Sequence, residues 1–226
     1  LQVAKVLKKM RIETIVILPK VDSSIFHERL VSNRINNHRI NINRLTKSIF
    51  GLSKYIIFFI YEVFLLYKYL SKNKFKLIHI SGGAWQIKGV LAGYLSKTKI
   101  LWHLNDTNMP IIVRSLFKLI SQNVDGFIFA SHRTKNYYHK FLPKAKLSFI
   151  IPAPVDTKLF SLNNKIDVNN QVAKMWDGKI VVGTVANVNP IKNLDLFIEL
   201  AINNKTNIKN LQFVIIGAIF PSQNNY

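Results

Sequence analysis

The chain has 226 residues, of which 49% are hydrophobic, and a formal net charge of +21 from 32 Lys and Arg against 11 Asp and Glu. This length and apolar content exclude a disordered chain, and the lack of cysteine excludes a disulfide framework and thiolate chemistry. The charge predicts attraction to nucleic acid, acidic lipid or phosphorylated small molecules, although heavy use of Asn, Ile and Lys leaves a purely compositional origin open.

Short helices and strands alternate along the first part of the chain. The spacing of apolar residues predicts a helix over 1–10, which lacks the pattern of a signal peptide, and a second helix over 24–31. An apolar run predicts a short buried strand over 13–18, closed by Pro19, and alternating polar and apolar residues predict a half-exposed strand over 39–45. Because parallel α/β domains normally open on a strand, this order suggests a fragment that lacks its first strand.

The most apolar segment, residues 48–70, predicts one long helix. Its length raises the question of a membrane span, but Lys54, Glu62 and Lys68 interrupt it, and charges near the centre of a bilayer are costly. Burial against a sheet is the simpler interpretation. An interfacial helix, with aromatic side chains and neighbouring lysines at a membrane surface, stays open as the alternative.

The first loop suited to ligand binding follows a short strand over 77–80. It holds Ser81, Gly82 and Gly83 and precedes a helix predicted over 84–95. Glycines directly after a strand let a ligand approach the backbone, and the helix start behind them favours negative charge. Because a glycine pair alone is weak evidence, an ordinary turn stays open.

A second polar cluster closes the next strand, which begins at Ile100. It contains His103, Asn105 and Asp106. Ligands of open parallel α/β sheets bind outside the carboxyl ends of the strands, so these side chains are expected where chemistry occurs. A simple turn beside a core histidine is the equally open alternative.

The alternation of helices and strands continues to the end of the chain. The predicted elements are helices over 111–120, 133–141 and 172–176, strands over 126–130, 147–151, 180–185 and 211–216, and a polar linker over 158–178. This order predicts an α/β protein with parallel sheets.

The segment 180–201 predicts a strand, a polar loop and a helix. Asn189 suits the N-cap of that helix, Pro190 its first position and Lys192 its first turn, so backbone N–H groups and one ammonium would converge on an anion. An ordinary βα unit with a surface lysine fits the same spacing. The sequence has no P-loop, GxSxG or HExxH motif and its histidines are dispersed, so we expect no metal site.

The order of these features resembles family 4 glycosyltransferases of the GT-B fold. The resemblance is carried by His103 after a mid-chain strand, Ser131 closing the next strand, Val155-Asp156 with Phe160, and the stretch 183–192. It implies two Rossmann-like domains, with an acceptor-side domain over 1–157, a linker over 158–178 and the start of a nucleotide-sugar-binding domain over 179–226.

The same resemblance implies roles for individual residues. As catalytic candidates, Lys192 would bind the donor diphosphate and stabilise its departing charge, and His103 would lie near the transferred sugar. Asn187 stands where the family usually has arginine, and Ala153-Pro154 where it usually has Asn-Gly. The implied donor-binding residues are Gly183, Asn187, Asn189 and Lys192, and the implied acceptor-side residues are Ser81, Gly82, Gly83, Asn105 and Asp106.

We therefore expect a retaining glycosyltransferase that moves a sugar from a nucleotide-sugar donor to a glycan or lipid-linked acceptor in cell-envelope polysaccharide biosynthesis, without a metal or other cofactor. The family's pair of donor-domain glutamates would follow Gly217 beyond the chain, so the fragment alone is expected to be inactive. We expect a cytoplasmic location, with peripheral attachment to an anionic membrane surface left open and no specific nucleic-acid partner. A basic protein that binds nucleic acid or anionic membrane, and an inactive glycosyltransferase-like domain, stay open as alternatives.

Overall fold

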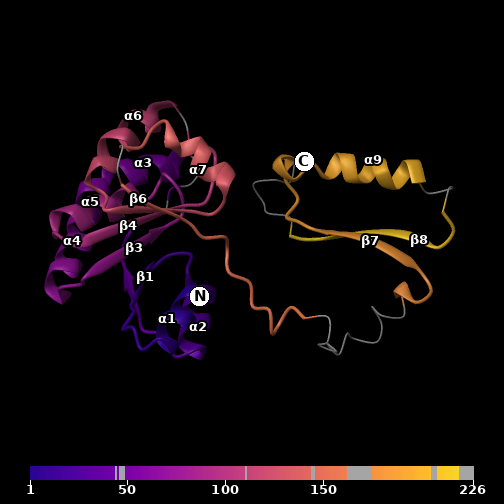
Figure 1. Ribbon diagram of the computed structural model, residues 1–226, viewed down its shortest axis with the longest axis horizontal. Coiled ribbons are helices and arrows are strands. Elements are labelled where there is room, and N and C mark those ends of the chain that lie inside the picture. Colours follow the sequence, from indigo (N-terminus) through magenta and orange to yellow (C-terminus); the bar gives the residue numbers. More distant parts are fainter. Residues whose placement is uncertain are drawn as a thin grey trace. The chain divides into compact units, whose positions relative to one another are not determined.

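The computed structural model describes residues 1–43, 45, 49–109, 111–143, 146–161, 175–204 and 208–218. The chain divides into two compact units, Leu1–Asp156 and Thr157–Tyr226. In both units parallel strands alternate with helices, which confirms the predicted α/β class (Figure 1). Most of the linker predicted over 158–178 and of the helix predicted over 172–176 lies outside the described residues.

The first unit is built on two parallel sheets. Its helices are α1 (Gln2–Lys9), α2 (Ser24–Ser32), α3 (Ile49–Ile57), α4 (Phe59–Asn73), α5 (Ile87–Leu95), α6 (Ile111–Ile120) and α7 (His132–His139), with a 3-10 turn η1 (Ser121–Asn123). Its strands are β1 (Val16–Pro19), β2 (Asn37–Ile40), β3 (Leu77–Ser81), β4 (Lys99–Leu104), β5 (Gly126–Phe129) and β6 (Leu147–Ile150). The strand orders are β1-β2 and β3-β4-β5-β6, and all pairs are parallel.

The four-stranded sheet buries one face beneath α5, α6 and α7 (Figure 1). Its register places Ile80 beside Trp102 and Trp102 beside Phe127, and because side chains alternate along a strand these residues share the buried face. Phe117 of α6 and Tyr138 of α7 pack into the same core, and both are fully buried. This core fixes the strand ends that carry the predicted site.

The prediction of a single helix over 48–70 is wrong. The chain forms α3 and α4, which are bent by 56° at a break beside Phe58. α4 buries Val63, Leu66 and Leu70 against α5 and the two-stranded sheet of β1 and β2. α3 has no buried residue, so packing on the core determines the direction of α4 but not that of α3. Ser48 lies outside the described residues.

No single helix in the described ranges is long and apolar enough to cross a bilayer. α3 and α4 taken together reach the necessary length and composition, but only as a bent pair. The composition of residues 49–73 therefore does not by itself distinguish a membrane contact from core packing.

The strand predicted over 39–45 is also misplaced, because β2 covers Asn37–Ile40. Its last residue, Ile40, pairs with Pro19 at the end of β1, so the ladder has no partner beyond it. The chain turns toward α4 instead, where the Asn43 backbone N–H donates to Glu62 Oε1 at 2.9 Å.

The second unit contains β7 (Ile180–Val185), a 3-10 turn η2 (Pro190–Lys192), α9 (Leu194–Asn204) and β8 (Leu211–Ile216). β7 and β8 are parallel and pair from Ile180 with Leu211 to Val185 with Ile216, as the apolar runs predict. Phe197 of α9 packs edge-on against Phe213 of β8, with ring centroids 5.5 Å apart.

Candidate functional site

The loops after β3 and β4 meet at the carboxyl edge of the four-stranded sheet. Ser81 and His103 are direct partners in the parallel register. The Gly83 backbone N–H donates to the His103 carbonyl at 3.4 Å, and Trp102 Nε1–H donates to the Gly83 carbonyl at 3.1 Å. Two of the predicted polar clusters are thus held together by backbone contacts.

The glycines of the first loop are required by its geometry. Gly82 has φ +130° and Gly83 has φ +82°, in the region that favours glycine. A Cβ at Gly83 would also lie 2.4 Å from Asp106 Oδ2, which is a clash. The loop therefore brings bare backbone against the Asp106 carboxylate.

The helix predicted over 84–95 begins later, at Ile87. The Gln86 backbone N–H donates to the Gly83 carbonyl at 3.4 Å, so the residues after the glycines form a turn before α5. Gln86 is the N-cap of α5, and its side chain makes no capping hydrogen bond. The start of α5 is thus set back from the glycine loop.

Asp106 does more than form a turn after β4. The Tyr138 hydroxyl of α7 donates to Asp106 Oδ1 at 2.7 Å. Burial, and then the hydrogen bond to Asp106, raise the pKa of Tyr138, so this tyrosine stays protonated and keeps donating. No local pattern indicates Tyr138, because its partner lies 32 residues away in the chain.

The His103 ring lies in a partly apolar setting. His103 Nε2 is buried and has no hydrogen-bond partner among the described residues. The ring stacks on His79 with centroids 5.5 Å apart, and burial lowers the pKa of both imidazoles, assisted at His79 by the charge of His103. A neutral imidazole with a free ring nitrogen can hydrogen-bond an uncharged hydroxyl group.

His79 was missed by the sequence analysis. It precedes Ser81 by two positions, so the alternation of a strand places it on the same sheet face as Ser81 and its partner His103. The pairing of β3 with β4 was the information needed to find it.

The predicted donor loop of the second unit lies between β7 and α9. Gly183 is part of β7 and pairs with Val214, and Asn187 is exposed after the strand. A Cβ at Gly217 would lie 1.9 Å from the Ala186 carbonyl oxygen, so the exits of β7 and β8 approach closely.

The prediction of one helix that begins after Asn189 is wrong. Asn189 is the N-cap of the short turn η2 and Pro190 is its first residue, but the helix α9 begins only at Leu194. Two i to i+3 bonds, from Lys192 N–H to Asn189 and from Asn193 N–H to Pro190, close a 3-10 turn. Asn193 then adopts φ +51°, which interrupts the helical path.

Lys192 consequently ends η2 and does not lie in the first turn of α9. Its side chain is exposed. The buried Asn189 Oδ1 has no hydrogen-bond partner in the part of the chain that the structure describes. The first turn of α9 carries Asp195, which makes the helix start itself less favourable for an anion than the turn before it.

Each of the two units thus contains one group of predicted residues. Ser81, Gly82, Gly83, His103 and Asp106 gather at one sheet edge in the first unit, with Asn105 exposed beside Asp106 in the same loop. In the second unit Gly183 lies in β7, Asn187 and Asn189 lie in the loop after it, and Lys192 ends η2.

The described residues contain no group of three or more His, Asp or Glu side chains placed to hold a metal ion. The expected independence from metals and other cofactors stays a prediction.

The sequence model of Glycosyltransferase Family 4 matches residues 1–159. No curated protein sequence matches the chain. The solved structure of Anabaena Alr3699/HepE in complex with UDP and glucose aligns with a TM-score of 0.75 and 14% identity over 99% of this chain and 58% of its own. A glycosyltransferase from Rickettsia africae ESF-5 aligns with a TM-score of 0.66 and 16% identity over 95% of this chain and 63% of its own. The chain therefore spans under two thirds of each protein, and the likenesses confirm the predicted α/β architecture of GT-B type.

Proposed function

The chain belongs to glycosyltransferase family 4, and on this basis we propose that the full-length protein transfers a sugar from a nucleotide-sugar donor to a glycan or lipid-linked acceptor. The observation that carries the proposal is the cluster of Gly83, His103 and Asp106 at the carboxyl edge of the sheet, within the matched residues. Alr3699/HepE has been solved with UDP and with UDP-glucose, which supports a uridine diphosphate sugar as the donor class.

In the proposed reaction the bond between the anomeric carbon and the diphosphate oxygen breaks, and its electron pair leaves with the diphosphate. The acceptor hydroxyl oxygen forms the new bond on the face that the diphosphate leaves, and its proton passes to the departing diphosphate oxygen, so configuration is retained. Stabilising the departing charge is the main catalytic task in such a reaction. We assign that task to the exposed ammonium of Lys192, because the Lys192 and Asn193 N–H groups already donate within the turn.

The residues of the first unit bind uncharged groups in this proposal. The His103 ring is neutral, and its Nε2, which has no partner among the described residues, binds a sugar or acceptor hydroxyl. The Asp106 carboxylate, held by Tyr138, orients a second hydroxyl. The glycine loop lets the backbone pack directly against the Asp106 carboxylate and so helps to fix its position.

Lys192 is the single cationic residue of the stretch 186–193. Asn187 supplies an amide where the family usually has a second cation, so donor binding should depend strongly on Lys192. A hydrogen bond to a charged group contributes about 1.5–3 kcal/mol, which corresponds to a rate change of about tenfold to a hundredfold.

The experiment measures nucleotide release from UDP-sugars by the full-length protein and by Lys192→Ala, with Lys209→Ala as the matched control. Both lysines are exposed in the second unit. We expect a tenfold to hundredfold loss for Lys192→Ala and no loss for Lys209→Ala. Equal activity of the two variants would remove Lys192 from the mechanism.

A role in cell-envelope polysaccharide synthesis, at the cytoplasmic face of a membrane, is part of the same proposal. The formal net charge of +21 motivates this part of the proposal, because basic proteins are attracted to the anionic lipids of that face. A lipid-linked acceptor would be found at the same face. An inactive glycosyltransferase-like domain would instead give a full-length protein that binds UDP-sugars without releasing nucleotide.

A further inference from the structure

An apolar surface covers α3 and the first turns of α4. Its nine large side chains are each at least 44% exposed: Ile49, Phe50, Leu52, Ile56, Ile57, Phe58, Ile60, Tyr61 and Phe64. Contiguous exposed apolar surface on soluble proteins generally marks an interaction site. We call these nine residues the docking face.

The docking face points away from the core of the first unit. On α4, Val63, Leu66 and Leu70 are buried, and Ile60 and Phe64, four residues apart, lie on the opposite side of the helix. α3 is attached to the unit through Tyr55.

Tyr55 makes two specific contacts. Its hydroxyl donates to the Trp85 carbonyl at 3.3 Å, and Lys88 Nζ lies 3.5 Å from the centre of its ring. These contacts fix one side of α3 and leave the docking face outward.

The charges around the docking face are of one sign. Glu62 is the single acidic residue between 49 and 76, it is 1% exposed, and it forms an ion pair with the buried Lys88. The lysines of the same segment are all exposed: Lys54, Lys68, Lys72, Lys74 and Lys76. Because the one acid of this segment is paired inside the unit, every exposed charge between residues 49 and 76 is positive.

We propose that the docking face inserts into the surface of a bilayer that contains anionic phospholipid, with the bordering lysines on the phosphate groups. Exposed apolar and aromatic side chains together with lysines on the same helical segment are typical of helices that bind at a membrane surface. The charge complementarity favours a lipid headgroup layer over a neutral protein partner.

The contact is at the membrane surface and does not span the bilayer. The buried side of α4 packs against Ile40 and Ala92 in the core, and the axes of α3 and α4 are bent by 56°. A membrane span would require the buried side chains of α4 to leave this core. Insertion at the membrane surface leaves them in place.

The docking face is connected to the candidate site through Tyr55, because Trp85 belongs to the loop that follows Gly83. A lipid-linked acceptor lying at α3 would therefore reach the acceptor-side loop. The inference extends the proposed function by naming this partner, but lipid binding is measured without any donor, so either proposal can fail alone.

The first test is flotation of the protein with vesicles of phosphatidylcholine alone and with equal parts of phosphatidylcholine and phosphatidylglycerol. Ile57→Asp is compared with Leu119→Asp, because these side chains are 73% and 68% exposed and each change adds one carboxylate. We expect binding to the mixed vesicles only, about tenfold or more weaker for Ile57→Asp and nearly unchanged for Leu119→Asp.

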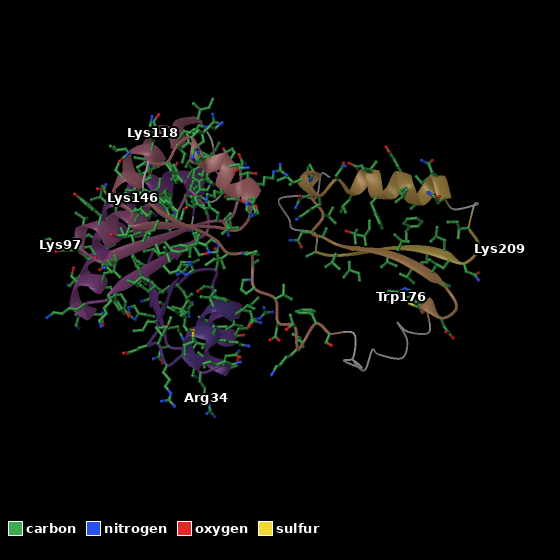
Figure 2. All side chains as sticks on the ribbon, viewed as in Figure 1. Arg34, Lys97, Lys118, Lys146, Trp176 and Lys209 are labelled. Atoms are coloured by element: carbon green, nitrogen blue, oxygen red, sulfur yellow. The ribbon has the colours of Figure 1, made fainter. Side chains whose placement is uncertain are left out.

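The second test separates a local contact from attraction by the net charge. Basic side chains such as Arg34, Lys97 and Lys118 project from different sides of the first unit (Figure 2), so a diffuse attraction would involve all of them. Lys68→Gln with Lys72→Gln is compared with Lys9→Gln with Lys118→Gln, and both pairs remove the same charge. Each lysine near an anionic surface strengthens binding about fivefold, so the first pair should lose about 25-fold and the second much less.

Equal losses in the two lysine pairs would overturn the proposal in favour of diffuse adsorption. Absence of wild-type binding to both kinds of vesicle would overturn it as well. If the protein were in addition a dimer that Ile57→Asp converts to a monomer, the occupant of the face would be a second copy of the chain. Circular dichroism of every variant should show unchanged folding, because all substituted side chains are exposed.

Discussion

The imidazole rings of His79 and His103 stack across neighbouring strands with centroids 5.5 Å apart and planes inclined by 17°. Burial lowers the pKa of both rings below the ordinary value of 6.5, and at His79 the neighbouring His103 lowers it further. Both rings are therefore neutral at neutral pH. A neutral pair keeps positive charge away from the edge where we propose that uncharged hydroxyl groups bind.

The histidine pair should make stability fall in mild acid. Because the folded-state pKa values are lowered, the unfolded chain takes up protons first, so stability is complete above about 6.5 and is lost as the pH falls below it. His79→Phe keeps a ring against His103 but removes one titrating group. Its free energy of unfolding should therefore fall less than that of the wild type between about pH 7.5 and pH 5. Urea denaturation at both pH values measures this, and identical falls would contradict it.

Gly83→Ala should damage the acceptor-side cluster. The new Cβ would meet the Asp106 carboxylate at a position where φ is already +82°, so Asp106 must move from its bond with Tyr138. We expect a loss of about 2–4 kcal/mol in the free energy of unfolding from strain and overpacking together. Chemical denaturation measures it.

Gly178→Ala is the matched control for this prediction. Gly178 also has a left-handed backbone, with φ +66°, but no atom lies within 4 Å of a Cβ there. Its cost should be limited to backbone strain of about 1–2 kcal/mol. Equal costs at the two glycines would show that the contact with Asp106 does not constrain the loop.

The buried pair of Glu62 and Lys88 should be costly to break from one side. Glu62→Gln keeps an oxygen that can accept from Asn43 but leaves the Lys88 ammonium without its counter-charge. We expect a loss of about 3–5 kcal/mol, because an unpaired buried charge is poorly tolerated. Denaturation of Glu62→Gln with Lys88→Met is the control, and this double variant should recover most of the loss. Failure to recover would mean that the pair contributes through its shape and not through its charge.

The sequence alone predicted most elements because their signals are local. Helix α6 (Ile111–Ile120) and strand β7 (Ile180–Val185) have the predicted limits. The errors arise where contacts distant in sequence decide. β2 ends at Ile40 because its partner strand ends, and the helix over 48–70 is divided because only α4 packs on the core.

The candidate site was predictable in part for the same reason. Gly83, His103 and Asp106 follow strand ends, and parallel strands bring such ends together. Tyr138 and His79 act through tertiary contacts that no spacing reveals. The left-handed conformation of Asn193, which separates Lys192 from α9, was equally invisible in the sequence.

In the proposed activity the full-length protein transfers a sugar from a nucleotide donor with retention of configuration. Incubation with UDP-sugars and a lipid-linked or glycan acceptor, followed by proton NMR of the anomeric signal, tests it most directly. We predict release of UDP together with a product whose anomeric configuration is that of the donor. A product of inverted configuration, or no release of nucleotide from any UDP-sugar tested, would contradict the claim.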